Sequence, residues 1–195
     1  MKKAVVTIRG TRPYWFHALP LDAIGGKRKE RTGSAGNDPE EWRKTFRADK
    51  DGQLYIPPEQ IFACLSAAGR HTKAGRGTIT KKVAATLQIV DKRILMDRSM
   101  PNNGSDPELN ALDDLVYIDC RAVRNPATKG SNIRYRIACS EGWEAAFTIL
   151  FDKTIVSEGE MHQVCLDSGI LEGLGDGRSI GMGRFEVLSF EAADV

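Results

Sequence analysis

A glycine-rich stretch near the C-terminal end carries the residue types best suited to contact a phosphate. Five glycines fall within residues 173–183, which read Gly-Leu-Gly-Asp-Gly-Arg-Ser-Ile-Gly-Met-Gly. Glycine tolerates a positive φ and lets backbone amides come close to an anion. The candidate phosphate contacts are Gly175, Gly177, Arg178, Ser179 and Arg184. The same residues also fit a tight turn that only packs the last strand against its sheet.

The elements around these glycines argue against a nucleotide-binding loop. A dinucleotide fingerprint needs a strand before the glycines and a helix after them, whereas this sequence indicates the reverse order. No Gly-Lys-Ser/Thr follows, so the Walker pattern is absent too. The chain also lacks H-E-x-x-H, G-x-S-x-G and clustered metal carboxylates. We therefore expect no cofactor and no metal.

The cysteines are four scattered residues without a C-x-x-C pair: Cys64, Cys120, Cys139 and Cys165. This spacing supports neither a zinc site nor a disulfide framework. We expect buried free thiols.

Basic side chains are concentrated in the first half of the chain. Residues 1–100 carry 20 Lys and Arg against 10 Asp and Glu, and residues 101–195 carry 8 against 16. Such asymmetry favours a basic surface that meets a polyanion, although a solvated mixed surface fits the same counts. The candidates form two clusters: Arg70, His71, Lys73, Arg76, Lys81 and Lys82, and then Arg121, Arg124, Lys129, Arg134 and Arg136.

Tyr14, Trp15 and Phe16 form an aromatic triplet after the first predicted strand. Aromatic rings stack on bases in single-strand-binding proteins. A triplet in this position more often belongs to a core or an interface, so both interpretations stay open.

The elements that would position these residues alternate between strands and helices. The helix signals are clear at Asp38-Pro39, at Pro57-Pro58 and at the capping box Ser157-x-x-Glu160. The predicted strands cover residues 2–10, 54–56, 83–96, 115–122, 133–139, 143–151 and 184–190. Helices begin near 38, 58 and 158, the second one ending at Gly69. This order predicts an α+β fold with an antiparallel sheet.

Two segments resemble the RAMP superfamily, the RNA-binding proteins of CRISPR systems. The stretch 173–185 is similar to the family's C-terminal glycine-rich loop, which lies between a helix and the last strand. Residues 54–70, Leu-Tyr-Ile-Pro-Pro-Glu-Gln-Ile-Phe-Ala-Cys-Leu-Ser-Ala-Ala-Gly-Arg, resemble a strand–Ile-Pro–helix–Arg segment of the repeating backbone subunits. Family members usually carry Ser-Ser-Leu-Lys-Gly where this chain has residues 59–63, Glu-Gln-Ile-Phe-Ala. The chain thus resembles a divergent relative.

The resemblance implies a ferredoxin-like (RRM-like) antiparallel sheet with helices on one face. It implies one RAMP-like domain over residues 1–195, with loop or hairpin insertions around 20–50, 69–82 and 99–132. The implied function is binding of RNA, or of another single-stranded nucleic acid, within a CRISPR-type or related ribonucleoprotein effector. Such a subunit coats the guide strand through phosphate contacts and assembles with copies of itself and with other effector subunits.

Two other functions fit the resemblance or the charge. Some RAMP relatives are metal-independent endoribonucleases, which makes His17 a candidate general base or acid and His71 a candidate to stabilise a scissile phosphate. Others cleave RNA with a loop aspartate, and Asp22 is the corresponding candidate. The third possibility is a protein–protein module of a phage or mobile-element assembly. A binding role is expected over catalysis.

The expected compartment is the cytoplasm. No apolar run approaches the roughly 18 residues that cross a bilayer, and the N-terminus does not have the pattern of a signal peptide. No membrane partner is expected.

Overall fold

The computed structural model describes residues 1–18, 38–101, 105–124 and 130–195. The loop predicted over residues 20–38 falls almost entirely outside these ranges. Two candidate site residues, Asp22 and Lys129, also lie outside them.

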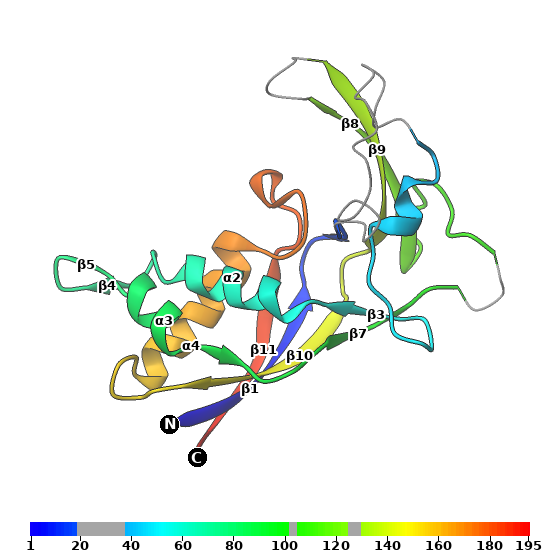
Figure 1. The fold of residues 1–195 in the computed structure, drawn as a ribbon. Helices are drawn as coiled ribbons and strands as arrows, with labels where there is room; N and C mark the ends of the chain where they lie inside the picture. The colour runs from blue at the N-terminus through cyan, green and yellow to red at the C-terminus, as the bar shows by residue number, and fades with distance from the viewer. Residues whose placement is uncertain (19–37, 102–104, 125–129) are drawn as a thin grey trace, which may run out of the picture.

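The main sheet has the strand order β11-β1-β10-β7-β3, and β6 pairs with β10 beside this path (Figure 1). All of these pairs are antiparallel. The strands are β1 (Lys2–Gly10), β3 (Gln53–Ile56), β6 (Gln88–Ile89), β7 (Ile94–Ser99), β10 (Glu144–Phe151) and β11 (Phe185–Asp194). Because β10 lies between β1 and β7, the unit β1–α2–β7 is the split β-α-β of a ferredoxin-like fold. The predicted α+β class is confirmed.

Alternation along β1 sets which face of this sheet is buried. Ala4, Val6 and Ile8 are fully buried, and the residues between them are partly or fully exposed. The buried face belongs to one core with the apolar residues of α2 (Pro58–Ala68) and α4 (Glu158–Asp167). Strand side chains alternate between faces with period two, so helices cover one side of the sheet.

A smaller sheet has the order β2-β9-β8 and extends away from the main sheet (Figure 1). It contains β2 (Tyr14–Trp15), β8 (Val116–Arg124) and β9 (Ser131–Cys139). The register of β8 and β9 runs from Val116 opposite Cys139 to Arg124 opposite Ser131. The predicted pair of antiparallel strands is therefore confirmed. The aromatic triplet is buried here and in the main core, and each of its residues is no more than 2% exposed. These rings are therefore not available to stack on bases, and the core interpretation holds.

The structure corrects the long strand predicted over residues 83–96. Its first part belongs to helix α3 (Thr80–Thr86), because Ile79, Val83 and Thr86 are buried at helical spacing. A Cβ on Gly69 would lie 2.8 Å from the Thr80 Cα, so the glycine permits α3 to pack beside the end of α2. The strand signal is realised only afterwards, in β6 and β7.

One other segment also differs from expectation. The helix predicted from Asp38 is only a 3-10 turn, η1 (Glu41–Lys44), and the Asp38 carboxylate accepts the Glu40 N–H before it. The basic segment 69–82 holds a short hairpin, β4 (Lys73–Ala74) and β5 (Gly77–Thr78). None of the helices in the described ranges is long and apolar enough to cross a membrane.

We predict that the capping box of α4 contributes measurably to stability. The Ser157 hydroxyl accepts the Glu160 N–H, and a Glu160 carboxylate oxygen accepts the Ser157 N–H at 2.8 Å. Ser157→Ala should lower the free energy of unfolding by about 1 kcal/mol, measured by urea denaturation. Ser157→Thr keeps the hydroxyl and should lose much less. Equal losses in both variants would show that the cap is not responsible.

Candidate nucleic-acid interface

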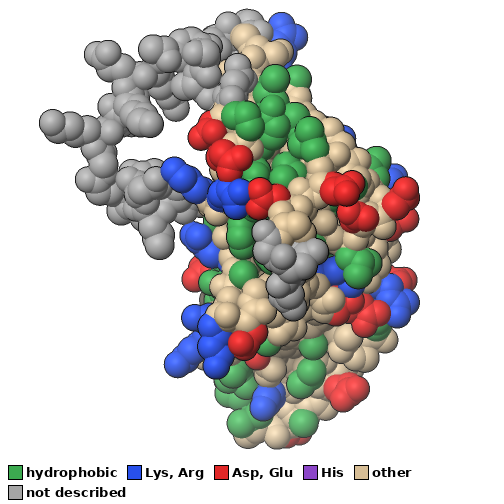
Figure 2. Space-filling view, turned by 90° about the vertical axis from the view of Figure 1, so that its right-hand side faces the viewer, with side chains coloured by type: hydrophobic (Ala, Val, Ile, Leu, Met, Phe, Trp, Pro, Cys, Tyr) green, Lys and Arg blue, Asp and Glu red, His purple; other side chains and the backbone are tan. Residues whose placement is uncertain are grey.

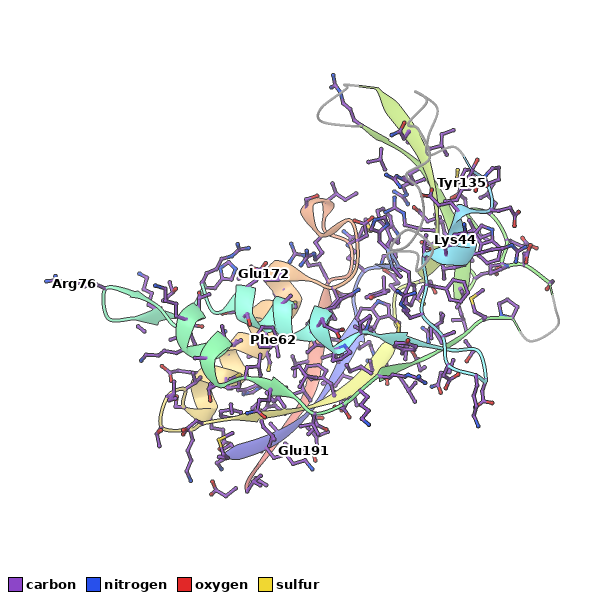
Figure 3. All side chains as sticks on the ribbon, viewed as in Figure 1. Lys44, Phe62, Arg76, Tyr135, Glu172 and Glu191 are labelled. Carbon is purple, nitrogen blue, oxygen red and sulfur yellow. The ribbon has the colours of Figure 1, made fainter. Side chains whose placement is uncertain are left out.

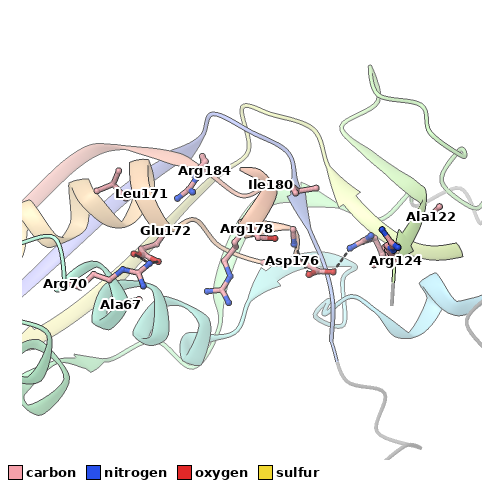
Figure 4. Close-up of a pocket in the computed structure, with 15 residues that line it drawn as sticks. Ala67, Arg70, Ala122, Arg124, Leu171, Glu172, Asp176, Arg178, Ile180 and Arg184 are labelled. Carbon is pink, nitrogen blue, oxygen red and sulfur yellow. Dashed lines mark hydrogen bonds and ion pairs between the residues drawn. The ribbon is translucent and has the colours of Figure 1, made fainter. Parts of the chain in front are cut away.

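A cleft of about 900 Å³ lies where the end of α2, the glycine-rich loop and the far end of the β8–β9 ladder meet (Figure 4). It unites residues from three segments that the sequence singled out separately: Arg70, then Arg124 and Arg136, then the loop residues Gly175, Gly177, Arg178, Ser179 and Arg184. Five arginines and two acids, Glu172 and Asp176, line it. The cleft is therefore strongly basic.

Arg124, Arg178 and Arg184 are the arginines of the cleft that no carboxylate holds. Arg124 and Arg178 are exposed, and neither side chain forms an ion pair or hydrogen bond within the described part of the chain. One guanidinium nitrogen of Arg184, Nη1, is buried without a hydrogen-bond partner. Arg184 lines the cleft without a carboxylate partner among the described residues, and this particular nitrogen is shielded from solvent.

Arg70 is held at the lip of the cleft by an acid. Glu172 is 9% exposed, and its two carboxylate oxygens contact Arg70 Nη2 at 2.6 and 2.8 Å. The same carboxylate lies 2.8 Å from His71 Nε2. Glu172 ends the π-helical turn η2 (Ser168–Glu172) that extends α4. The pairing orients Arg70 but partly neutralises it.

Arg136 occupies a different position from the other arginines, because its side chain is only 5% exposed. It forms ion pairs with Asp119, which is fully buried, and with Asp176 of the glycine-rich loop. Figure 4 shows the second pair as a dashed line. Its guanidinium also lies 4.6 Å from the centre of the Trp15 ring. These contacts make Arg136 a residue that positions the cleft wall.

The glycines of the loop are required by the close approach of Trp15. Gly175 and Gly177 have φ of +73° and +70°. A Cβ on Gly175 would lie 2.5 Å from the Trp15 carbonyl oxygen, and one on Gly177 would lie 2.6 Å from the indole ring. The Asp176 N–H donates to the same carbonyl at 2.8 Å. These two glycines are thus required for the loop to pack against Trp15.

Between Gly177 and Gly181 the loop turns outward as the 3-10 turn η3 (Arg178–Ile180). Hydrogen bonds from Ile180 N to Gly177 O and from Gly181 N to Arg178 O, both 3.0 Å, close the turn. The loop therefore packs on Trp15 with one side and presents Arg178, Ser179 and Ile180 to the cleft with the other.

Most residues of the first basic cluster do not line the cleft. Lys73 and Arg76 belong to the β4–β5 hairpin, and Lys81 and Lys82 to α3. Arg121 donates to Asp119 at 2.6 Å and lies over the Trp15 ring.

The remaining candidates of the β8–β9 ladder and the histidines lie elsewhere. Arg134 pairs with Glu41 at 3.0 Å. With His17 it lines a separate cavity of about 140 Å³, which also borders Arg136 and Asp176. His162 stacks on Phe190 with 4.8 Å between ring centres.

The cleft contains residues that the sequence analysis missed. Glu172, Asp176, Leu171 and Ile180 all line it. Ile180 is 63% exposed although it is flanked by the basic loop. An isoleucine inside a glycine- and arginine-rich turn was the available signal, but only the turn geometry shows that it points outward.

Metal and thiol chemistry find no support in the described ranges. No group of three or more His, Cys, Asp or Glu side chains there is placed to hold a metal ion. All four cysteines are free; Cys64, Cys139 and Cys165 are buried as expected, whereas Cys120 is only partly buried. Burial raises the pKa of Cys64 to about 12 and also raises the pKa of Cys139 and Cys165. These thiols are therefore protonated at neutral pH.

We predict that Gly177→Ala destabilises the protein more than Gly181→Ala. Both residues have positive φ, +70° and +84°, which costs an alanine roughly 1 kcal/mol in each case. Only at position 177 would the Cβ meet the Trp15 ring, since position 181 has open space around it. Overpacking should add about 1–3 kcal/mol. Equal midpoints in thermal or urea unfolding would contradict this role for Trp15.

Comparison with known proteins supports the fold but not a family. No family model matches the chain, and no curated protein matches it. A chain in the cryo-EM structure of the Type III-B Cmr-beta bound to cognate target RNA is similar, with a TM-score of 0.56 and 15% sequence identity. The match covers 99% of this chain and 61% of that one, so this chain spans about three fifths of its neighbour's length. The likeness shows a shared fold.

Proposed function

We propose that the chain is an RNA-binding subunit of a CRISPR-type ribonucleoprotein effector and a divergent RAMP-like protein, residues 1–195 forming one domain. A single strand of RNA lies in the cleft, and the arginines bind its phosphates. Copies of the chain associate along the strand with one another and with other effector subunits.

One observation carries the proposal. Three guanidinium groups, those of Arg124, Arg178 and Arg184, line one cleft without a carboxylate partner within the described residues. Guanidinium groups bind phosphate oxygens in a bidentate manner. Concentrating unpaired cations in a hollow is electrostatically unfavourable unless an anion occupies it. A phosphate backbone supplies such anions at regular intervals.

The residues that line the cleft also indicate which parts of an RNA strand it would contact. Its polar groups are arginines and backbone amides, which contact phosphate and sugar more than base edges. Leu171 and Ile180, 43% and 63% exposed, offer apolar contact to any base. Binding should accordingly show little sequence preference. The fold shared with a chain of an RNA-bound Cmr-beta structure supports the proposal that the ligand is RNA.

We predict that Arg124→Ala with Arg178→Ala weakens RNA binding equally for different sequences. Each lost phosphate contact should reduce the slope of log K against log salt by about 0.7 for a single strand, so two should reduce it by about 1.4. Affinity at low salt should fall on the order of tenfold or more. Fluorescence anisotropy with labelled single-stranded RNAs of two compositions, over a salt series, measures both quantities.

The matched control is Lys3→Ala with Lys92→Ala, which removes two exposed cations outside the cleft. This variant should keep the affinity and the slope of the wild type. Wild-type binding that does not respond to salt, or an equal loss in both double variants, would refute the proposal.

A further inference from the structure

The β4–β5 hairpin is a basic surface that the cleft does not use. Lys73 pairs with Thr78 and Ala74 with Gly77, which leaves Gly75 and Arg76 at the tip. Residues 60–90 contain no Asp or Glu, and Lys73 and Arg76 are exposed. Neither forms an ion pair within the described residues. Figure 3 shows Arg76 at the tip of the hairpin, which projects outward from one end of the molecule.

The opposite end carries an acidic and apolar segment, residues 105–115. Leu109, Leu112 and Leu115 are 57%, 59% and 61% exposed. Glu108, Asp113 and Asp114 are exposed among them, and these three carboxylates form no ion pair within the described ranges. Figure 2 faces this end and shows hydrophobic and acidic side chains close to one another. Three largely exposed leucines within seven residues mark an interaction site.

This segment is a defined surface held against β8. The Asn110 N–H donates to Ile118 O at 2.8 Å, and the Ile118 N–H donates to Glu108 O at 2.9 Å. The Asn110 side-chain oxygen accepts the Cys120 N–H at 2.9 Å, with Asn110 itself at a positive φ of 53°. These bonds, and the packing of Ala111 against the Trp15 cluster, fix the backbone while the leucines remain outside.

The two surfaces cannot meet within one molecule, because the hairpin and the segment 105–115 lie at opposite ends (Figure 1). They are different surfaces of opposite charge, so a contact that joins the hairpin of one copy to the segment 105–115 of another can repeat head to tail. The aliphatic stems of Lys73 and Arg76 are able to cover the leucines while their charged ends reach the carboxylates.

We propose that the β4–β5 hairpin of one copy docks on the segment 105–115 of the next copy. This deepens the proposed function, on which it rests, by naming the two surfaces through which copies associate along the strand. None of the residues of either surface lines the cleft. Nucleic acid and the neighbouring copy therefore occupy separate sites, and each can be disrupted alone.

Charge reversal tests the contact. The hairpin variant carries Lys73→Glu and Arg76→Glu, and the loop variant carries Asp113→Lys and Asp114→Lys. In either variant alone the two surfaces have the same sign and repel. Mixed in equal amounts, the acidic hairpin of one variant meets the basic loop of the other, and the remaining two surfaces are also complementary. Sedimentation velocity should show association for the wild type and the mixture, but smaller species for each variant alone.

RNA binding is measured in parallel on an oligonucleotide that accommodates one copy. Both charge variants should keep wild-type affinity within roughly twofold, because cations outside the cleft make no phosphate contact there. The cleft variant with Arg124→Ala and Arg178→Ala should still associate without RNA. Association that depends on the charges, in a protein that binds no RNA, would leave the docking contact standing and refute only the proposed function.

Three results would overturn the docking contact. The mixture remains as dissociated as its components; the wild type fails to associate both alone and on a long RNA; or the hairpin variant loses RNA affinity as the cleft variant does, which would make the hairpin an RNA contact. Circular dichroism of each variant confirms its fold. Leu109→Ser with Leu112→Ser should weaken association as well, since it removes the apolar part of the contact.

Discussion

A chain of ion pairs that starts at the buried Asp119 joins the small sheet to the glycine-rich loop at the cleft. Asp119 is fully buried on β8, and Arg136 on β9 lies directly opposite it. Arg136 then reaches Asp176 of the glycine-rich loop. Removing one member of such a pair leaves a buried charge uncompensated, which is strongly unfavourable. The small sheet and the loop, which are far apart in sequence, are thereby held together.

Trp15 lies at the centre of this arrangement. The guanidinium groups of Arg121 and Arg136 lie 4.5 and 4.6 Å from the centre of its ring, and such cation–π contacts are strongest for a desolvated cation, here the buried Arg136. The glycine-rich loop also packs on Trp15, where Gly175 lies against the carbonyl oxygen and Gly177 lies against the indole ring. The indole thus fills the space between the ion pairs and the loop, and its position sets where η3 begins.

The molecule keeps its charged surfaces apart from one another. The cleft gathers arginines from three segments at the junction of the two sheets, whereas the β4–β5 hairpin and the segment 105–115 lie at opposite ends. The basic first half of the sequence supplies the hairpin and the acidic second half supplies the segment 105–115, yet four of the five cleft arginines come from the acidic half. The proposed assembly along a polyanion needs both a cationic groove and complementary ends, and the described residues provide a candidate surface for each.

Local patterns in the sequence determined much of the fold. The alternation in β1, the capping box of Ser157 and Glu160, and the helix between Pro58 and Ala68 depend on neighbouring residues, so they could be predicted. The helix α3 could not, because burial of Val83 against the core decided between helix and strand for a short apolar segment. The order of the sheet was inferred only through the resemblance to a family.

The residues of the candidate site could likewise be predicted in part from the sequence and in part only from the structure. Arg70, Arg124, Arg178 and Arg184 were predicted from residue type, and the order of helix, glycines and strand was read correctly. Only the tertiary structure brought these arginines into one cleft, removed Lys73 and Arg76 from it and buried Arg136. The physical reason is that a cation's role depends on which carboxylate lies beside it, and Asp119, Asp176 and Glu172 reach their arginines through long-range contacts that no local spacing encodes.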